Sequence, residues 1–207
     1  MEGTKQIASL SGDYGAFLVY VSTDYVFSGN KGMYTESDGT NPINYYGKTK
    51  LEAEKIVQNL MSNWCIVRPS VIYGSVPAAG KVNFVLWVLE KLRKGEQIKI
   101  ITDQIISPTL NTNLAEMILE VAQKHLTGIY HLSGATPINR YDFASLIAET
   151  FDLDKKLIKP ATSEEMNWTA KRPKNTSLIV DKASRELNKK PLMIKDALNQ
   201  LKKELTE

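Results

Sequence analysis

The hydrophobic positions along the chain follow two alternating patterns. A continuous apolar run, typical of a strand buried on both faces of a parallel sheet, occurs at residues 16–21, and residues 64–68 and 98–101 are also strand-like. Between them apolar residues recur every three or four positions, as on one face of a helix, most clearly in residues 44–61. Further helices are predicted at 83–94, 112–125, 141–151 and 194–204, and further strands at 129–132 and 157–159. This alternation predicts an α/β fold.

Composition narrows the class of protein. Of the 207 residues, 43% are hydrophobic and 24% are charged, as in ordinary globular proteins. The longest apolar runs fall far short of the roughly 18 residues that span a bilayer, so no membrane segment is predicted. The N-terminus lacks the pattern of a secretory signal, and the single cysteine, Cys65, lies in an apolar strand as a core residue would. A cytoplasmic protein is expected.

The net charge and the positions of the histidines argue against nucleic-acid binding and against a metal site. The net charge of +3 is small and evenly spread, so no nucleic-acid partner is expected, although it suits an anionic small molecule. His125 and His131 have no cysteine or acid at ligand spacing, so no metal site is expected.

The helix predicted at 44–61 carries the first chemical signal. Tyr46 and Lys50 are four residues apart, which places both side chains on one face, one turn from each other. A neighbouring ammonium favours the phenolate, so the lysine is expected to make the tyrosine a better acid or base near neutral pH. Thr23 follows the strand at 16–21, at the sheet edge where open α/β folds bind ligands.

Several motifs surround these residues in a fixed order: Ser-Thr-Asp-Tyr-Val-Phe at 22–27, Tyr-Gly-Lys-Thr-Lys at 46–50, and Arg-Pro-Ser-Val-Ile-Tyr-Gly at 68–74. The chain resembles the extended short-chain dehydrogenase/reductases, most closely the dTDP-4-dehydrorhamnose reductase-like branch. The likeness continues through Asp-Gln at 103–104, Ser-Pro-Thr at 107–109 and Arg-Pro at 172–173, and it covers nearly the whole chain.

The resemblance implies a hydride-transfer enzyme that uses NADP or NAD. Thr23, Tyr46 and Lys50 match the catalytic triad of the family, in which the tyrosine protonates a carbonyl oxygen, the threonine orients it, and the lysine also binds the nicotinamide ribose. Tyr46 and Lys50 would thus also bind the cofactor. Pro69 and Ser70 match the loop beside the nicotinamide.

The resemblance also implies a nucleotide-sugar substrate. Thr23 and Asp24 match substrate contacts, and Arg172 lies in a C-terminal motif where a guanidinium would suit a diphosphate; a surface salt bridge is the alternative for Arg172. Sugar-nucleotide dehydratases of similar fold carry a glutamate after the aspartate. Here that position is Tyr25, which disfavours dehydration.

The sequence departs from the family at its beginning. It lacks the glycine-rich turn that receives a cofactor pyrophosphate, and residues 1–8 are typical of the middle of a helix. We therefore expect an incomplete Rossmann-like doubly wound sheet without its first strands, and impaired cofactor binding. Residues 1–82 are expected to form the dinucleotide-binding part and residues 83–207 the substrate-binding region, with the strand at 129–132 returning to the main sheet. The strand at 16–21 would then present a free edge and favour homo-oligomers.

Two smaller departures concern the substrate. Val71 stands where rhamnose-pathway reductases carry a tryptophan, and Ile106 replaces a glycine. The hypothesis is a reductase of 4-keto nucleotide sugars. The alternatives are a nucleotide-sugar epimerase, or a non-catalytic regulatory protein similar to the methionine adenosyltransferase beta subunit, which the motifs at 24–27 and 46–50 also resemble.

Overall fold

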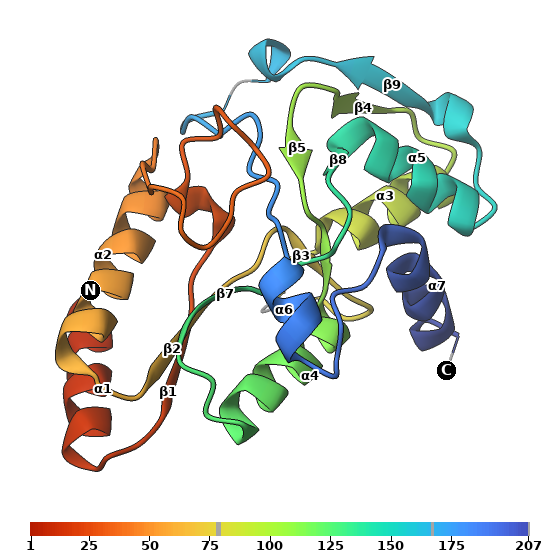
Figure 1. Ribbon diagram of the computed structural model, residues 1–207. Coiled ribbons are helices and arrows are strands. Elements are labelled where there is room, and N and C mark those ends of the chain that lie inside the picture. Colours follow the sequence, from red (N-terminus) through yellow and green to blue (C-terminus); the bar gives the residue numbers. More distant parts are fainter. Residues whose placement is uncertain (78–79, 167, 207) are drawn as a thin grey trace.

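A computed structural model describes residues 1–77, 80–166 and 168–206. Its centre is a parallel sheet in the order β1 (Leu18–Val21), β2 (Trp64–Arg68) and β7 (Gly128–His131) (Figure 1). β2 lies in the middle: Cys65 pairs with Val19 on one side and with Gly128 on the other. The α/β fold with parallel strands is therefore confirmed.

Helices cover both faces of this sheet. One face carries α1 (Glu2–Asp13) and α2 (Tyr45–Leu60), and the other carries α4 (Asn111–Gln123) and the short α6 (Asp181–Glu186) (Figure 1). Neighbouring residues of a strand point to opposite faces. Ile66 accordingly packs with the α1–α2 face, whereas Cys65 and Val67 pack with the α4 face. Cys65 is fully buried, as its apolar surroundings in the sequence predict.

A second hydrophobic core lies beside the sheet. It is enclosed by α3 (Phe84–Arg93), α5 (Arg140–Thr150), α7 (Ile194–Glu204) and the parallel pair β4 (Ile98–Ile101) and β9 (Ile158–Ala161). Two further pairs of short strands contribute to this second core: β3 (Ile72–Tyr73) with β6 (Thr109–Leu110), and β5 (Ile105–Ile106) with β8 (Ile138–Asn139). Three 3-10 turns complete the described elements: η1 (Asp24–Val26), η2 (Lys155–Leu157) and η3 (Ser163–Glu165).

Asparagine marks the start of three helices. The side chains of Asn44, Asn83 and Asn139 accept hydrogen bonds from backbone amides in the first turns of α2, α3 and α5. These amides have no partner within the helix, so the asparagine oxygen fixes the residue at which the helix begins. For α2 this sets the position of Tyr46 in its first turn.

Except for α1, the longer elements agree with the sequence-based predictions to within about two residues at each end. α1 continues to Asp13, beyond the residues 1–8 that were expected to be helical. The elements that the sequence did not indicate are α6, the 3-10 turns and the two-residue strands. Such elements are too short to display a periodicity. β7 pairs with β2, so the chain returns to the main sheet after residue 82. The division into units at 82 and 83 stays a prediction.

The C-terminal segment crosses back over the N-terminal part of the molecule. Leu178 forms a parallel bridge with Tyr34, and Asn175 forms one with Ile105. These contacts place residues 168–178 next to the loop that follows β1. In the described part of the chain, no helix is both long and apolar enough to cross a membrane.

Candidate active site

The structure gathers Thr23, Tyr46 and Lys50 around the carboxyl end of β1. Thr23 lies two residues beyond the strand, and Tyr46 and Lys50 lie in the first two turns of α2. The Lys50 ammonium donates a hydrogen bond of 2.9 Å to the Val21 carbonyl, and it lies 5.1 Å from the centroid of the Tyr20 ring. This bond ties α2 to the end of the strand that leads into Thr23.

Tyr46 faces an open cleft. Its side chain is 51% exposed, and its ring meets the Tyr25 ring edge-on with centroids 6.0 Å apart. Gly47 allows this close approach, because a Cβ atom at that position would lie 2.2 Å from the Tyr25 carbonyl oxygen. The glycine in the Tyr-Gly motif therefore places the first turn of α2 directly against η1.

Thr23 and Asp24 are buried. The Thr23 hydroxyl accepts a hydrogen bond from the Tyr25 amide and donates one of 3.1 Å to the Asp24 carboxylate. The other carboxylate oxygen of Asp24 accepts hydrogen bonds from Ser70 at 2.8 Å and Thr176 at 2.6 Å. The sequence suggested that Asp24 contacts substrate, but in this structure the carboxylate is 3% exposed and links three segments of the chain.

The loop after β2 is also buried. Pro69 accepts a hydrogen bond from the Asp24 amide, and the Ser70 hydroxyl is engaged with Asp24. Val71 has a φ of +35°, which is unusual for a β-branched residue. Its carbonyl accepts a bond from the Thr109 amide, and this contact helps to hold the strained backbone. Ile106 is fully buried in the second core, so its replacement of a glycine affects packing.

Burial shifts the pKa values of three groups here. It lowers the pKa of Lys50, with the nearby Glu54 carboxylate opposing the shift. Burial raises the pKa of Asp24, against the hydrogen bonds from Thr176, Ser70 and Thr23. Burial also raises the pKa of Tyr25, and the Asp24 carboxylate adds to that effect.

The cleft in front of Tyr46 is closed from the other side by the C-terminal segment. It has a volume of about 620 Å³ and is lined by Tyr25, Asn44, Tyr45, Tyr46 and residues 168–172. The structure thus brings Arg172 and Tyr46 to one cleft, although they are far apart in the sequence.

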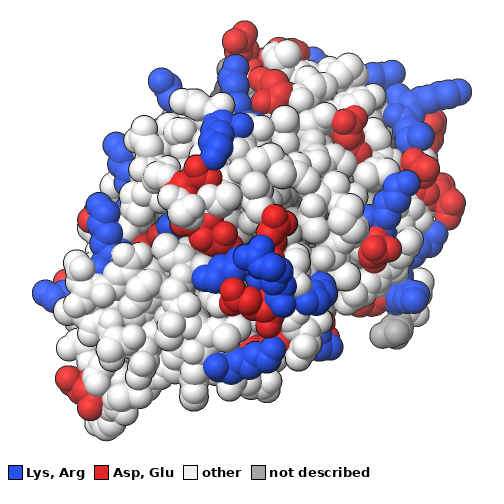
Figure 2. Space-filling model, in the orientation of Figure 1, with Lys and Arg blue, Asp and Glu red and all other residues white. Residues whose placement is uncertain are grey.

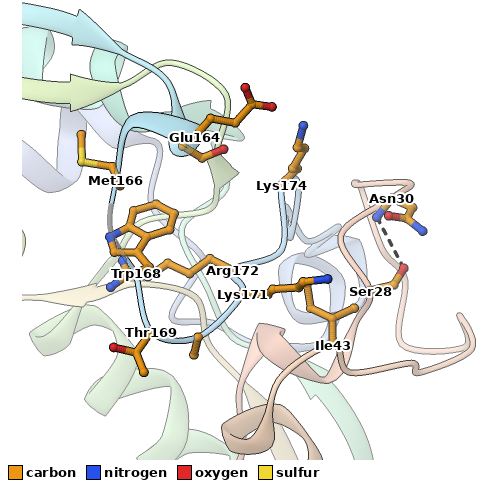
Figure 3. A pocket seen from close by; sticks show the side chains of 12 residues that line it. Ser28, Asn30, Ile43, Glu164, Met166, Trp168, Thr169, Lys171, Arg172 and Lys174 are labelled. Atoms are coloured by element: carbon orange, nitrogen blue, oxygen red, sulfur yellow. Dashed lines mark hydrogen bonds between the residues drawn. The ribbon is translucent and has the colours of Figure 1, made fainter.

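The segment 168–172 is shared with a second, adjoining cleft of about 690 Å³ (Figure 3). The Arg172 guanidinium lies 4.2 Å from the centroid of the Trp168 ring. Lys171, Lys174 and Glu164 also line this second cleft. Trp168 had no signal in the sequence beyond being an isolated aromatic residue in a loop.

Two buried charged residues connect α2, which carries Tyr46 and Lys50, to the central strand β2. Glu54 of α2 and Arg68 of β2 form an ion pair of 2.6 Å, with side chains 1% and 3% exposed. Sequence analysis missed this pair. The available signal was the arginine at the end of an apolar strand and a glutamate in line with Lys50, but pairing them requires the arrangement of the fold.

The two histidines lie in different surroundings. Among the described residues, no group of three histidine, cysteine or acidic side chains could hold a metal ion. His131 is fully buried, and burial together with the Arg68 charge lowers its pKa to about 4. His125 is exposed.

The fold and this arrangement of side chains define a Rossmann-like protein of the short-chain dehydrogenase/reductase class. The RmlD substrate binding domain model matches residues 1–207, and the chain belongs to that family.

Characterised relatives share most of this chain. It is 30% identical over 203 residues to the dTDP-4-dehydrorhamnose reductase of Aggregatibacter actinomycetemcomitans, covering 92% of this chain and 68% of that protein. It is 32% identical over 170 residues to methionine adenosyltransferase 2 subunit beta of Danio rerio, covering 79% of this chain and 52% of that one. The chain therefore spans about half to two thirds of the length of these relatives.

A solved structure agrees with the fold. The dTDP-4-dehydrorhamnose reductase of Bacillus anthracis, in complex with NADP, superposes with a TM-score of 0.90 at 31% identity. The match covers 98% of this chain and 70% of that structure.

Proposed function

We propose that this chain carries the catalytic and sugar-binding part of an NAD(P)H-dependent reductase of 4-keto nucleotide sugars. The observation that supports it most is the cleft shared by Tyr46 and Arg172, with Lys50 fixed one turn behind Tyr46. The similarity to dTDP-4-dehydrorhamnose reductases points to the same reaction class.

In this mechanism the chain's own residues manage the proton. A nicotinamide, when bound, supplies the hydride. Tyr46 gives its phenolic proton to the carbonyl oxygen of the sugar, and Lys50 lies one turn further along the same face of α2. Thr23 orients the same oxygen once its hydroxyl exchanges the bond to Asp24 for one to substrate. Asp24 itself would act on substrate through Thr23.

The residues present fit the ribose end of a nicotinamide cofactor, either NADP or NAD. Tyr46 is half exposed, and Lys50 lies beside it at the sheet edge with its ammonium held at the Val21 carbonyl. Pro69 and Ser70 lie in a buried loop, and the backbone of this loop would form one side of the nicotinamide site. Arg172, with Lys171 beside it, would bind the diphosphate of the sugar nucleotide, because a guanidinium donates two parallel hydrogen bonds to phosphate oxygens.

A second candidate function is a non-catalytic regulatory subunit. The similarity to methionine adenosyltransferase 2 subunit beta favours it, since that protein matches over 79% of this chain. Under this hypothesis Tyr46 and Lys50 would bind a ligand or partner without turnover.

The deciding experiment is a fluorescence titration of the 207-residue protein with NADPH and NADH, followed by an assay on dTDP-4-dehydrorhamnose. Saturable binding and turnover that Tyr46→Phe abolishes would support the reductase, and release of oxidised cofactor would separate it from an epimerase. Binding without turnover would favour the regulatory subunit. Failure to bind either cofactor would contradict the reductase hypothesis for this chain.

We also propose that β1 pairs with a second copy of the chain. In the described sheet β1 lies at an edge and pairs only with β2, and such an edge offers unpaired backbone groups. Around α1 and β1 the surface shows a broad area with few charged side chains (Figure 2). Light scattering should give a mass that rises with concentration; a constant monomer mass would contradict the proposal.

A further inference from the structure

Glu54 contacts both the last residue of β2 and the residue that follows β1. It lies on α2, four residues after Lys50, and its carboxylate accepts hydrogen bonds from Arg68 Nη2 at 2.6 Å and Arg68 Nε at 3.0 Å. The same carboxylate accepts a hydrogen bond from the Ser22 hydroxyl. All three residues are buried, with Ser22 4% exposed.

Each of the three segments joined in this way leads directly into a proposed site residue. Ser22 precedes Thr23, Arg68 precedes Pro69, and α2 carries Tyr46 and Lys50. The Glu54 carboxylate therefore fixes three elements relative to one another: the end of β1, the end of β2, and α2.

Stability alone is a poor explanation for this pair. Removing two charges from water is costly, and apolar residues of similar volume often serve a fold equally well. A paired carboxylate differs from an apolar contact in two respects: its hydrogen bonds have fixed directions, and its charge acts on neighbouring ionisable groups.

We propose that Glu54 is a positioning residue of the active site, which aligns Thr23 with Tyr46 and Lys50 and sets the charge environment of the Lys50 ammonium. This inference rests on the proposed function for its catalytic meaning, but the alignment itself is independent of it.

The surroundings of Glu54 support an electrostatic role. Lys50 lies on the same face of α2, and the Glu54 charge opposes the effect of burial on the pKa of Lys50. From β1, Tyr20 faces the same carboxylate, and burial with the Glu54 charge raises the pKa of Tyr20 to about 12. From β7, His131 faces the Glu54–Arg68 pair. The Arg68 guanidinium lies 5.2 Å from the centroid of the Phe27 ring, which shields the pair from solvent.

The test compares Glu54→Gln with Glu52→Gln in the 207-residue protein. Glu52 is an exposed glutamate on the same helix, pairs with Lys55, and serves as the matched control. With lysines labelled with ¹³C at Cε, and Lys50 assigned from Lys50→Arg, NMR follows the ionisation of Lys50. Glu54→Gln should lower its midpoint, because the charge that opposes the effect of burial is lost, and Glu52→Gln should leave it in place. A folded Glu54→Gln protein with an unchanged Lys50 midpoint would overturn the proposal.

A milder variant covers the case in which Glu54→Gln does not fold. Ser22→Ala removes one hydrogen bond to Glu54 and leaves the ion pair intact. We expect a urea midpoint close to that of the parent protein but at least about threefold faster amide exchange at Thr23 and Asp24. Unchanged exchange at both amides would count against the alignment.

These readouts need no cofactor, so they stand even if the protein fails to bind NADPH. Where turnover is detected, Glu54→Asp, which keeps the charge, should retain more of kcat than Glu54→Gln, with KM nearly equal in both. Equal kcat values for the two variants would contradict a positioning role.

Discussion

Thr176 donates a hydrogen bond of 2.6 Å to the carboxylate of Asp24, although the two residues are 152 positions apart in the sequence. Both are buried, and the same carboxylate oxygen accepts a bond from Ser70. The bond attaches the C-terminal segment, which carries Trp168 and Arg172, to the turn that carries Thr23. The two walls of the cleft are thereby held in register.

Replacing Thr176 tests this attachment. Thr176→Val removes the hydroxyl and leaves a buried carboxylate with one donor fewer, so the free energy of unfolding should fall by about 1–3 kcal/mol. Thr176→Ser, which keeps the hydroxyl, should lose much less. Exposed Thr206 is the control: Thr206→Val should change stability by no more than about 0.5 kcal/mol in urea denaturation. Equal losses for Thr176→Val and Thr206→Val would be evidence against the attachment.

Gly47 should tolerate no side chain. An alanine Cβ there would meet the Tyr25 carbonyl and the Pro42 ring, so Gly47→Ala should destabilise the protein by about 1–3 kcal/mol and move Tyr46 away from Tyr25. Gly3 of α1 has nothing within 4 Å of its Cβ position, and Gly3→Ala should be neutral or stabilising by up to about 1 kcal/mol. Thermal denaturation of both variants measures the difference in stability. A Gly47→Ala protein as stable as the parent would show that α2 does not pack tightly against Tyr25.

His131 should make stability depend on pH. Its pKa is lowered to about 4 in the folded protein and is about 6.5 when unfolded, so between these values the unfolded chain binds more protons. Stability should therefore decrease as pH falls from 6.5 to 4, by about 3 kcal/mol for this residue. His131→Asn should flatten that part of the profile, whereas exposed His125→Asn should not. The check is urea denaturation at several pH values; parallel profiles for both variants would refute it.

The pairing of Arg172 with Trp168 provides a spectroscopic test of sugar-nucleotide binding. A diphosphate that binds Arg172 would draw the guanidinium away from the ring, so dTDP should change the tryptophan fluorescence saturably. Arg172→Ala should weaken dTDP binding at least about tenfold, as expected when a charged contact to phosphate is lost. Lys159→Ala, at an exposed position of β9, should leave affinity unchanged. Equal dTDP affinities in the two variants would show that Arg172 does not bind the diphosphate.

The part of the fold that rests on local pattern was predictable. The helix that contains Tyr46 is indicated by the periodicity of its apolar residues, and the strand that contains Cys65 is indicated by its run of apolar residues. The Tyr46–Lys50 spacing also places two side chains on one helix face without any knowledge of tertiary structure.

What escaped prediction depends on contacts between distant residues. Nothing in the sequence near Asp24 indicates that Thr176 and Ser70 enclose its carboxylate, because both partners lie far from Asp24 along the chain. The Glu54–Arg68 pair was missed for the same reason: each residue alone is typical of an exposed charge, and only the packing of α2 on β2 brings them together.

The crossing of residues 168–178 over the N-terminal part has a consequence for biosynthesis. Tyr46, Lys50 and Thr23 precede Trp168, Arg172 and Thr176 by more than a hundred residues in the sequence, so they leave the ribosome first. A nascent chain can form β1, β2 and α2, but it has only one wall of the cleft. The cleft is complete only after residues 168–172 have been synthesised, so arrest or cleavage before residue 168 leaves Tyr46 and Lys50 without the segment that faces them.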